Sequence, residues 1–155
     1  QALNTELTIV LLLMVMLYDK SSQHQLLFLL LSTAFIGFTL YYFFPTTAPA
    51  SIIDSPFFLN EQRQTYIKFF LIHNHLPPPD ITAGGLIAMP SFHCIWILIC
   101  QYYLSRWKWL FYSVLPLNIA LITACVFLGW HYLIDIIISF IIVSLMIFTS
   151  KRLSP

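Results

Sequence analysis

The sequence predicts an all-α protein, a polytopic membrane helix bundle of about five spanning helices with one further helix at the membrane interface. Only 8% of the 155 residues are charged and 59% are hydrophobic, whereas about 25% of residues are charged in an average soluble domain. Apolar runs near the ~20 residues that cross a bilayer recur along the chain. We find no internal repeat, and expect residues 1–155 to form a single membrane-embedded domain.

The first two apolar runs predict a pair of antiparallel spanning helices. Residues 2–17 form a dense apolar run, and a polar turn is expected over residues 21–25. Residues 26–44 form the second run, which closes at Pro45 because proline cannot continue a helix. Because the chain opens at Gln1 rather than at a methionine, a further helix can precede it.

The segment 45–89 is expected to be an external loop that contains an interfacial helix. Within it, residues 57–76 mix apolar side chains with charged and amide side chains, a composition too polar to cross lipid but suited to a helix lying in the interface. The prolines at 77–79 should end this helix. The glycines at 84–85 allow a tight return toward the membrane.

Three more spans are predicted at residues 91–104, 107–128 and 131–149. They are separated by Ser105-Arg106 and by Gly129-Trp130.

The basic residues give the predicted orientation. One set of helix ends carries Lys20, Arg106, Lys108, Lys151 and Arg152. By the positive-inside rule these ends are cytoplasmic. Pro45, Met89 and His131 then share the extracytoplasmic, periplasmic or lumenal, face.

Two histidines stand at the openings of these apolar runs, where an ionisable side chain is costly unless it has a partner. His93 opens one span and His131 another, and the predicted topology places both at the same membrane level. Asp135 follows His131 by four residues, so the two share a helical face. A carboxylate there can accept a ring N–H, fix the tautomer and raise the basicity of the free nitrogen. An aspartate inside a span costs about 2.5–3.5 kcal/mol, which favours a functional role for Asp135.

The start of the span at 91–104 predicts an anion site. Ser91 follows Pro90 and is expected to cap the helix, where free backbone N–H groups and the positive end of the helix dipole attract anions. An anion held there would lie against His93. Two histidines in unlike surroundings suggest one proton donor and one nucleophile.

These motifs resemble a known family. Ile-Ala-Met-Pro-Ser-Phe-His at 87–93 and Gly-Trp-His-Tyr-Leu-Ile-Asp at 129–135 are similar to the two histidine motifs of the type 2 phosphatidic acid phosphatase superfamily, closest to its inositol phosphorylceramide synthase-like branch. Phe-Pro-Thr-Thr-Ala-Pro-Ala at 44–50 also resembles a proline-rich signature of that branch. The resemblance implies that His131 attacks phosphorus, that Asp135 orients it, and that His93 protonates the leaving group.

The chain departs from the classical family pattern at two arginines. Ala124 and Cys125 stand where the third motif often has Ser-Arg. The synthase-like branch also lacks that arginine. In the first motif, Lys68 matches the lysine and His75 takes the arginine place. The chain therefore lacks the bidentate arginine grip that suits phosphate. Candidate substrate-binding residues are Ser91, Lys68, His75, Arg63 and Trp130, the last as a wall of the site.

The resemblance predicts a membrane lipid phosphatase that uses a phosphohistidine to hydrolyse a phospholipid or prenyl phosphate. A lipid phosphotransferase that moves a headgroup to an alcohol, and a catalytically silent membrane binding protein, are the alternatives. We expect no cofactor. We also expect no metal ion: His73, His75 and Asp80 could mimic a metal site, but two histidines two residues apart on a helix point their rings in different directions. A net charge of +1, with scattered basic residues, predicts no nucleic-acid partner. The sequence leaves the oligomeric state open.

Overall fold

The computed structural model describes the whole chain except residues 1, 54, 57, 59, 78–86 and 154–155, and within helices it leaves out the side chains at 2, 3, 14, 15, 60–63 and 153. Over the described residues the structure is all-helical, which confirms the predicted class. Its helices are α1 (Ala2–Leu17), α2 (Lys20–Phe43), α3 (Asn60–His73), α4 (Phe92–Leu104), α5 (Lys108–Phe127) and α6 (Leu133–Leu153), with a 3-10 turn, η1, at Pro49–Ser51.

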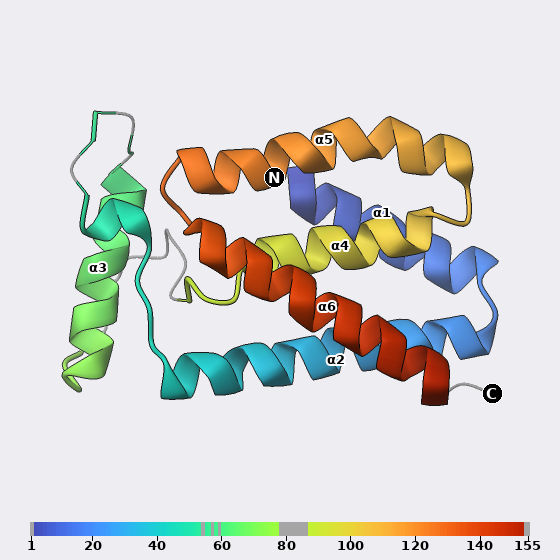
Figure 1. Cartoon of the computed structure of the whole chain (residues 1–155), viewed down its shortest axis with the longest axis horizontal. Coiled ribbons are helices and arrows are strands. Elements are labelled where there is room, and N and C mark those ends of the chain that lie inside the picture. Colours follow the sequence, from blue (N-terminus) through green and yellow to red (C-terminus); the bar gives the residue numbers. More distant parts are fainter. Residues whose placement is uncertain (1, 54, 57, 59, 78–86, 154–155) are drawn as a thin grey trace.

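Five of these helices run lengthwise and α3 crosses one end (Figure 1). The central helix is α4, which packs against α1, α2, α5 and α6. The crossing helix α3 packs against η1. This arrangement gives the bundle a capped end, where α4 and α6 begin, and an opposite end, where they finish.

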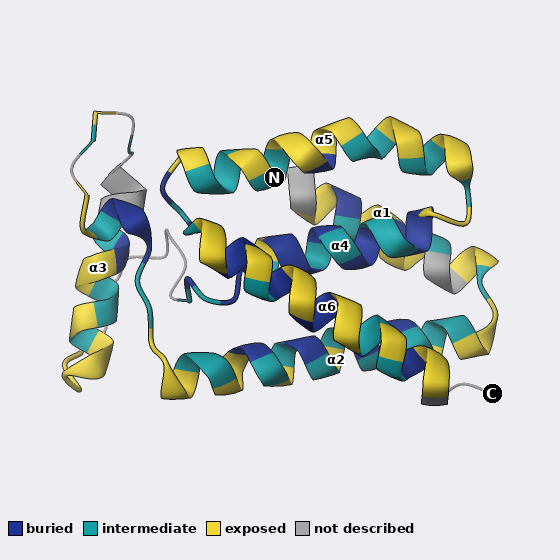
Figure 2. Cartoon of the chain, viewed as in Figure 1, coloured by how far each residue is buried: buried dark blue, intermediate teal, exposed yellow. Residues whose placement is uncertain are grey.

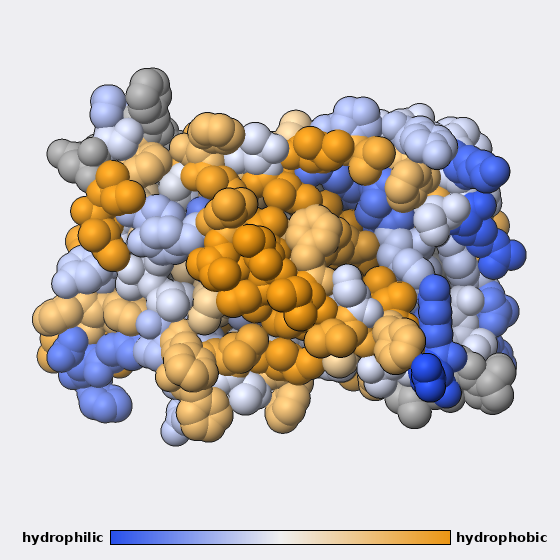
Figure 3. Space-filling model, in the orientation of Figure 1, coloured by the Kyte–Doolittle hydropathy of each residue, from blue (hydrophilic) through white to orange (hydrophobic). Residues whose placement is uncertain are grey.

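The core is built around α4. Its Ile95, Ile99 and Cys100 are fully buried, and Leu29 of α2 and Val143 of α6 pack in the same cluster. A helix that is apolar all round is expected in the interior, and Figure 2 shows the buried residues gathered along α4. The outer helices instead turn apolar side chains outward, and Figure 3 shows these as a hydrophobic band between two more polar ends.

Three helices are long and apolar enough to cross a membrane: Lys20–Phe43, Lys108–Phe127 and Leu133–Arg152. The predicted runs at 2–17 and 91–104 do form helices, but the apolar parts, Asn4–Leu13 and Phe92–Leu104, are shorter. The 13 residues of α4 span about 20 Å, less than the ~30 Å of a hydrocarbon core. A helix enclosed by its neighbours on all sides need not match that thickness.

The predicted polar turn over residues 21–25 is wrong, because α2 already begins at Lys20. Asp19 caps the helix: its Oδ2 accepts the backbone N–H of Ser22 (3.3 Å) and its Oδ1 accepts the Ser22 hydroxyl (2.7 Å). These hydrogen bonds hold the pKa of Asp19 below its usual value. A good N-cap thus extends the helix through polar residues that the hydropathy pattern assigned to a turn.

A buried polar cluster, which the sequence did not predict, joins three helices. The side-chain amide of Asn118 on α5 donates to Glu6 Oε1 on α1 (3.0 Å) and to Gln101 Oε1 on α4 (2.7 Å). Asn118 is the one buried residue of α5. Interhelical hydrogen bonds of this kind hold helices together where apolar surface gives no preference for one partner over another.

Candidate active site

The start of α4 places His93 near the capped end of the bundle. Ser91 is the N-cap residue, as predicted, and its hydroxyl accepts the backbone N–H of Cys94 (3.3 Å). Just before it, the backbone N–H of Met89 donates to Thr46 Oγ1 (3.0 Å). The cap fixes the first turn of α4, in which His93 is the second residue.

The turn from α5 to α6 places His131. Gly129 has φ +73°, a left-handed conformation that favours glycine. Its carbonyl accepts the backbone N–H of Ala50 in η1 (3.0 Å), and the carbonyl of Cys125 accepts the N–H groups of both Trp130 and His131 (3.0 Å each). The backbone that carries His131 is therefore held on both sides.

Gly129→Ala is expected to destabilise the protein by about 1–3 kcal/mol, since the left-handed conformation costs an alanine about 1–2 kcal/mol. The added Cβ would also lie 2.7 Å from two ring carbons of Phe58 and 3.0 Å from the Cβ of Ala50. Thermal unfolding in detergent should show a clearly lower midpoint, while Ser113→Ala on the exposed face of α5 should leave it unchanged. An unchanged midpoint in Gly129→Ala would contradict this account of the turn.

The ring of His131 is held in one tautomer. Its Nδ1 lies 2.8 Å from the carbonyl oxygen of Ala88. A carbonyl oxygen can only accept, so the proton is on Nδ1 and the lone pair is on Nε2. His131 is buried, with 4% of its surface exposed.

Asp135 lies beside His131 but does not form the predicted hydrogen bond with its ring. Its Oδ2 lies 3.7 Å from His131 Nδ1, beyond hydrogen-bonding distance, and instead accepts the backbone N–H of Tyr132 (2.8 Å). Asp135 is only 1% exposed. The hydrogen bond to Ala88 therefore orients the His131 ring, and the Asp135 carboxyl lies close to the same ring nitrogen.

A residue that the sequence analysis missed, Ser139, ties the starts of α4 and α6 together. Its hydroxyl accepts the backbone N–H of Ser91 (2.9 Å) and lies within donating distance of the carbonyl of Asp135 (2.7 Å) and that of Ser91 (3.2 Å). Ser139 is fully buried. Its one sequence signal is a hydroxyl four residues beyond Asp135 within an apolar run.

Ser139→Ala is expected to cost about 1–3 kcal/mol of stability, because the buried N–H of Ser91 loses its acceptor. The thermal unfolding midpoint should fall. Ser144→Ala, which removes an exposed hydroxyl from the same helix, is the matched control and should have no effect. Equal midpoints for the two variants would show that Ser139 does not join α4 to α6.

A cavity of about 400 Å³ lies between the two histidines and α3; we call it the histidine cavity. The rings of His93 and His131 both line it, with centroids 5.8 Å apart and planes at 61°. The remaining walls come from Ala34, Phe38, Thr47, Ala48, Thr65, Phe69, Ile87, Ala88, Phe92, Trp96 and Trp130. The cavity is therefore mostly apolar, with its ionisable groups gathered at one place.

The structure brings together some of the predicted site residues and separates others. Trp130 lines the histidine cavity with His93 and His131. Ser91 does not, because its hydroxyl is buried and occupied as the cap of α4. Asp135 lies behind His131 rather than in the cavity wall.

The predicted cationic candidates lie on or after α3. Lys68 is half-buried and falls between Thr65 and Phe69, both of which line the histidine cavity. His75 is exposed, in the turn that follows α3, with φ +55°. The side chain of Arg63 lies outside the described residues, as do the predicted turn at 84–85 and Asp80. Among the described residues, no lysine or arginine lines the cavity.

The described part of the chain contains no group of three or more His, Cys, Asp or Glu side chains placed to hold a metal ion. Its three cysteines are free: Cys94 and Cys100 are buried, and Cys125 is half-buried.

A family model described as "PAP2 superfamily" matches residues 1–149, a range that includes both histidine motifs and the whole cavity wall. The chain belongs to the PAP2 superfamily. This confirms the predicted superfamily, the type 2 phosphatidic acid phosphatases, and membership of the PAP2 superfamily suggests phosphatase or phosphotransferase activity. Searches of curated proteins and of solved structures returned no match.

Proposed function

We propose that the protein is a membrane lipid phosphatase that hydrolyses a lipid phosphomonoester or pyrophosphate through a phosphohistidine on His131. One observation carries the proposal: His93 and His131 line the same cavity with ring centroids 5.8 Å apart, and Ala88 holds the Nδ1 proton so that Nε2 keeps its lone pair. A fixed tautomer beside a second histidine suits nucleophilic catalysis with a general acid.

In the proposed reaction, Nε2 of His131 attacks phosphorus while the bond from phosphorus to the leaving oxygen breaks. His93 gives its proton to that oxygen. The group that departs is the lipid alcohol of a phosphomonoester or the lipid monophosphate of a pyrophosphate. The buried Asp135 carboxylate stabilises the positive charge that His131 gains. Water then attacks the phosphohistidine, His93 takes its proton, and inorganic phosphate leaves with both histidines restored.

A lipid substrate fits the walls of the histidine cavity. Phe38, Phe92 and Trp96 offer an apolar surface to chains, while the phosphorus would lie between the two histidines. We propose a phospholipid or a prenyl phosphate as the substrate, drawn from the membrane lipids around the bundle. No cofactor enters this reaction.

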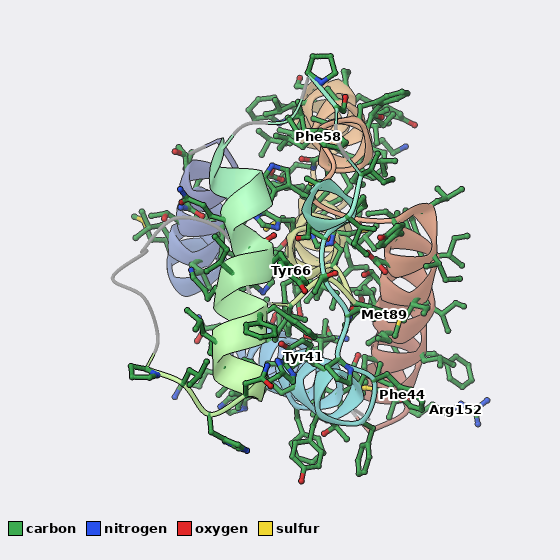
Figure 4. All side chains as sticks on the ribbon, turned by 90° about the vertical axis from the view of Figure 1, so that its left-hand side faces the viewer. Tyr41, Phe44, Phe58, Tyr66, Met89 and Arg152 are labelled. Carbon is green, nitrogen blue, oxygen red and sulfur yellow. The ribbon has the colours of Figure 1, made fainter. Side chains whose placement is uncertain are left out.

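Phosphate charge would be neutralised from α3. In Figure 4 this helix crosses the end of the bundle nearest the viewer, with Tyr66 on it and Met89 in the segment that leads into α4. We propose that Lys68, Arg63 and His75 supply the positive charge. The Ser91 cap contributes by fixing the start of α4 rather than by touching phosphate.

We further propose a multi-pass topology in which α1 and α4 cross with the three long helices, α3 lies in the interface, and the histidine cavity faces the extracytoplasmic side. The segment 45–89 would then be the external loop of a single domain, 1–155. Support comes from the lengthwise packing of α1 and α4 with the longer helices and from the basic residues at the opposite end.

Cysteine labelling tests this orientation. In intact cells, a membrane-impermeant thiol reagent should label Leu76→Cys, which is exposed after α3, and should label Ser105→Cys, exposed at the opposite end, only after permeabilisation. The unsubstituted chain is the control for Cys94, Cys100 and Cys125. If Ser105→Cys were labelled in intact cells and Leu76→Cys only after permeabilisation, the histidine cavity would face the cytoplasm.

The second candidate is a lipid phosphotransferase of the inositol phosphorylceramide synthase-like branch, favoured by Ala124 and Cys125 in place of the Ser-Arg pair. Both reactions share the steps up to the phosphohistidine. They differ in whether water or an alcohol accepts the phosphorus.

One experiment separates the candidates. Purified protein in detergent is incubated with phosphatidic acid, phosphatidylglycerophosphate or a prenyl pyrophosphate, with and without chelator and an added alcohol acceptor. Phosphate release that survives chelator supports the phosphatase, whereas headgroup transfer with little free phosphate supports the transferase. No turnover on any substrate would support a catalytically silent binding protein.

A further inference from the structure

A second cavity lies at the opposite end of the bundle from the histidine cavity. It has a volume of about 310 Å³ and is lined by residues of four helix ends, among them Tyr18, Ser22, Tyr102, Tyr103, Arg106 and Lys151. We call it the basic-end cavity. In Figure 1 this is the end away from α3, where α1 meets α2 and α4 meets α5.

Two cations from distant parts of the chain converge on this cavity. Arg106 follows the end of α4, and Lys151 is in the last turn of α6. The guanidinium carbon of Arg106 lies 5.1 Å from the centre of the Tyr18 ring, and Lys151 Nζ lies 5.4 Å from that of Tyr102. Aromatic faces orient these cations but leave their charge and their N–H donors available.

No carboxylate pairs with Arg106 or Lys151 among the residues that the structure describes. The nearest acidic residue in sequence to the cavity wall is Asp19, whose two oxygens accept hydrogen bonds from Ser22. Among the described residues, the two positive charges of the basic-end cavity therefore have no carboxylate within ion-pair distance.

The polar walls of the cavity are already fixed. The hydroxyl of Tyr18 donates to the carbonyl of Tyr103 (2.6 Å), and that of Ser105 donates to the carbonyl of Tyr102 (2.6 Å). The first bond joins the end of α1 to the end of α4, and the second lies within the last turn of α4. Together they hold in place the aromatic rings that contact Arg106 and Lys151. A preorganised pair of cations binds an anion with less loss of side-chain entropy.

We propose that the basic-end cavity binds a phosphate-bearing anion between Arg106 and Lys151. Guanidinium and ammonium groups are common protein donors to phosphate oxygens. Figure 3 shows the hydrophobic band giving way to a more polar end, and the lining residues Ser105, Arg106 and Lys151 lie at the ends of α4 and α6. In the topology proposed above, this end lies at the depth of lipid headgroups. The ligand is the phosphate of an anionic lipid or a free phosphate, and binding does not depend on the reaction at His131.

Lipid binding to the full chain in detergent tests the site. Native mass spectrometry would measure the apparent Kd for phosphatidylglycerol, for zwitterionic phosphatidylcholine and for inorganic phosphate. We expect phosphatidylglycerol to bind more tightly than phosphatidylcholine, and R106Q/K151Q to weaken it about 25-fold, since each cation near anionic headgroups contributes about fivefold. Binding of inorganic phosphate with the same dependence on these two residues would identify a free anion as the ligand.

Two further variants keep the result interpretable. K108Q/R152Q removes the same number of charges from the same end without touching the cavity wall and should change the Kd less than twofold. R106K/K151R keeps both charges and should retain binding, which separates loss of charge from loss of fold. Equal weakening in K108Q/R152Q or undiminished binding in R106Q/K151Q would each overturn the proposal. Equal affinity for the two lipids would also overturn it if inorganic phosphate showed no binding that depends on Arg106 and Lys151.

Discussion

His131→Ala is expected to reduce phosphate release by at least about a thousandfold, because removing the nucleophile of a covalent mechanism leaves only binding and electrostatic effects. The variant should also lose the covalent intermediate. Labelled lipid phosphate, quenched in alkali during turnover, should leave a base-stable, acid-labile phosphate on the parent protein and none on the variant.

His24→Ala is the matched control for this loss. His24 is exposed on α2 and lies outside the histidine cavity, so its replacement should leave the rate and the labelling unchanged. A labelled phosphohistidine that persists in His131→Ala would place the nucleophile elsewhere. Substantial turnover by that variant would remove the proposed mechanism altogether.

His93→Asn is expected to slow lipid turnover by about 10²–10⁴-fold, the contribution typical of a general acid or base. Asparagine can hydrogen-bond but cannot carry the proton that the departing lipid alkoxide needs. The loss should depend on the leaving group. An aryl phosphate releases a stable phenolate, so it should still phosphorylate His131 in the variant.

The second half-reaction gives the sharper readout. With the aryl phosphate, His93→Asn should show a burst of phenolate equal to the enzyme present and then stall as phosphohistidine, because water lacks its general base. His24→Asn should show steady turnover. Equal loss of the burst and of the steady rate in His93→Asn would assign His93 to substrate binding rather than to proton transfer.

Hydropathy located the long apolar helices well. It failed at the start of α2, where a capping residue determines where the helix begins. The runs at 26–44, 107–128 and 131–149 correspond to α2, α5 and α6. The error at residues 21–25 arose because Asp19 caps α2, a single-residue effect within a polar stretch. The enclosed position of α4 depends on contacts with four other helices, which no window of sequence contains.

The sequence predicted the side chains of the site but not the backbone groups that contact them. The pairing of His93 with His131 follows from topology, and both line one cavity. The partner of His131 Nδ1 was not predictable, because it is the carbonyl of Ala88 and every residue has a carbonyl. Ser139 likewise acts on backbone groups of Ser91, a contact visible only once α4 and α6 are placed together.

The orientation of His131 by Ala88 has a consequence for how this site can diverge. A backbone carbonyl neither ionises nor depends on the side chain attached to it, so the tautomer of His131 is insulated from substitution at position 88. Any small residue that fits the buried space there would keep the lone pair on Nε2 of His131. The path of the main chain at Ala88 must be kept. The hydrogen bond from the Met89 N–H to Thr46 Oγ1 helps to fix that path. Relatives could therefore carry another small residue at position 88 and keep the same tautomer at position 131.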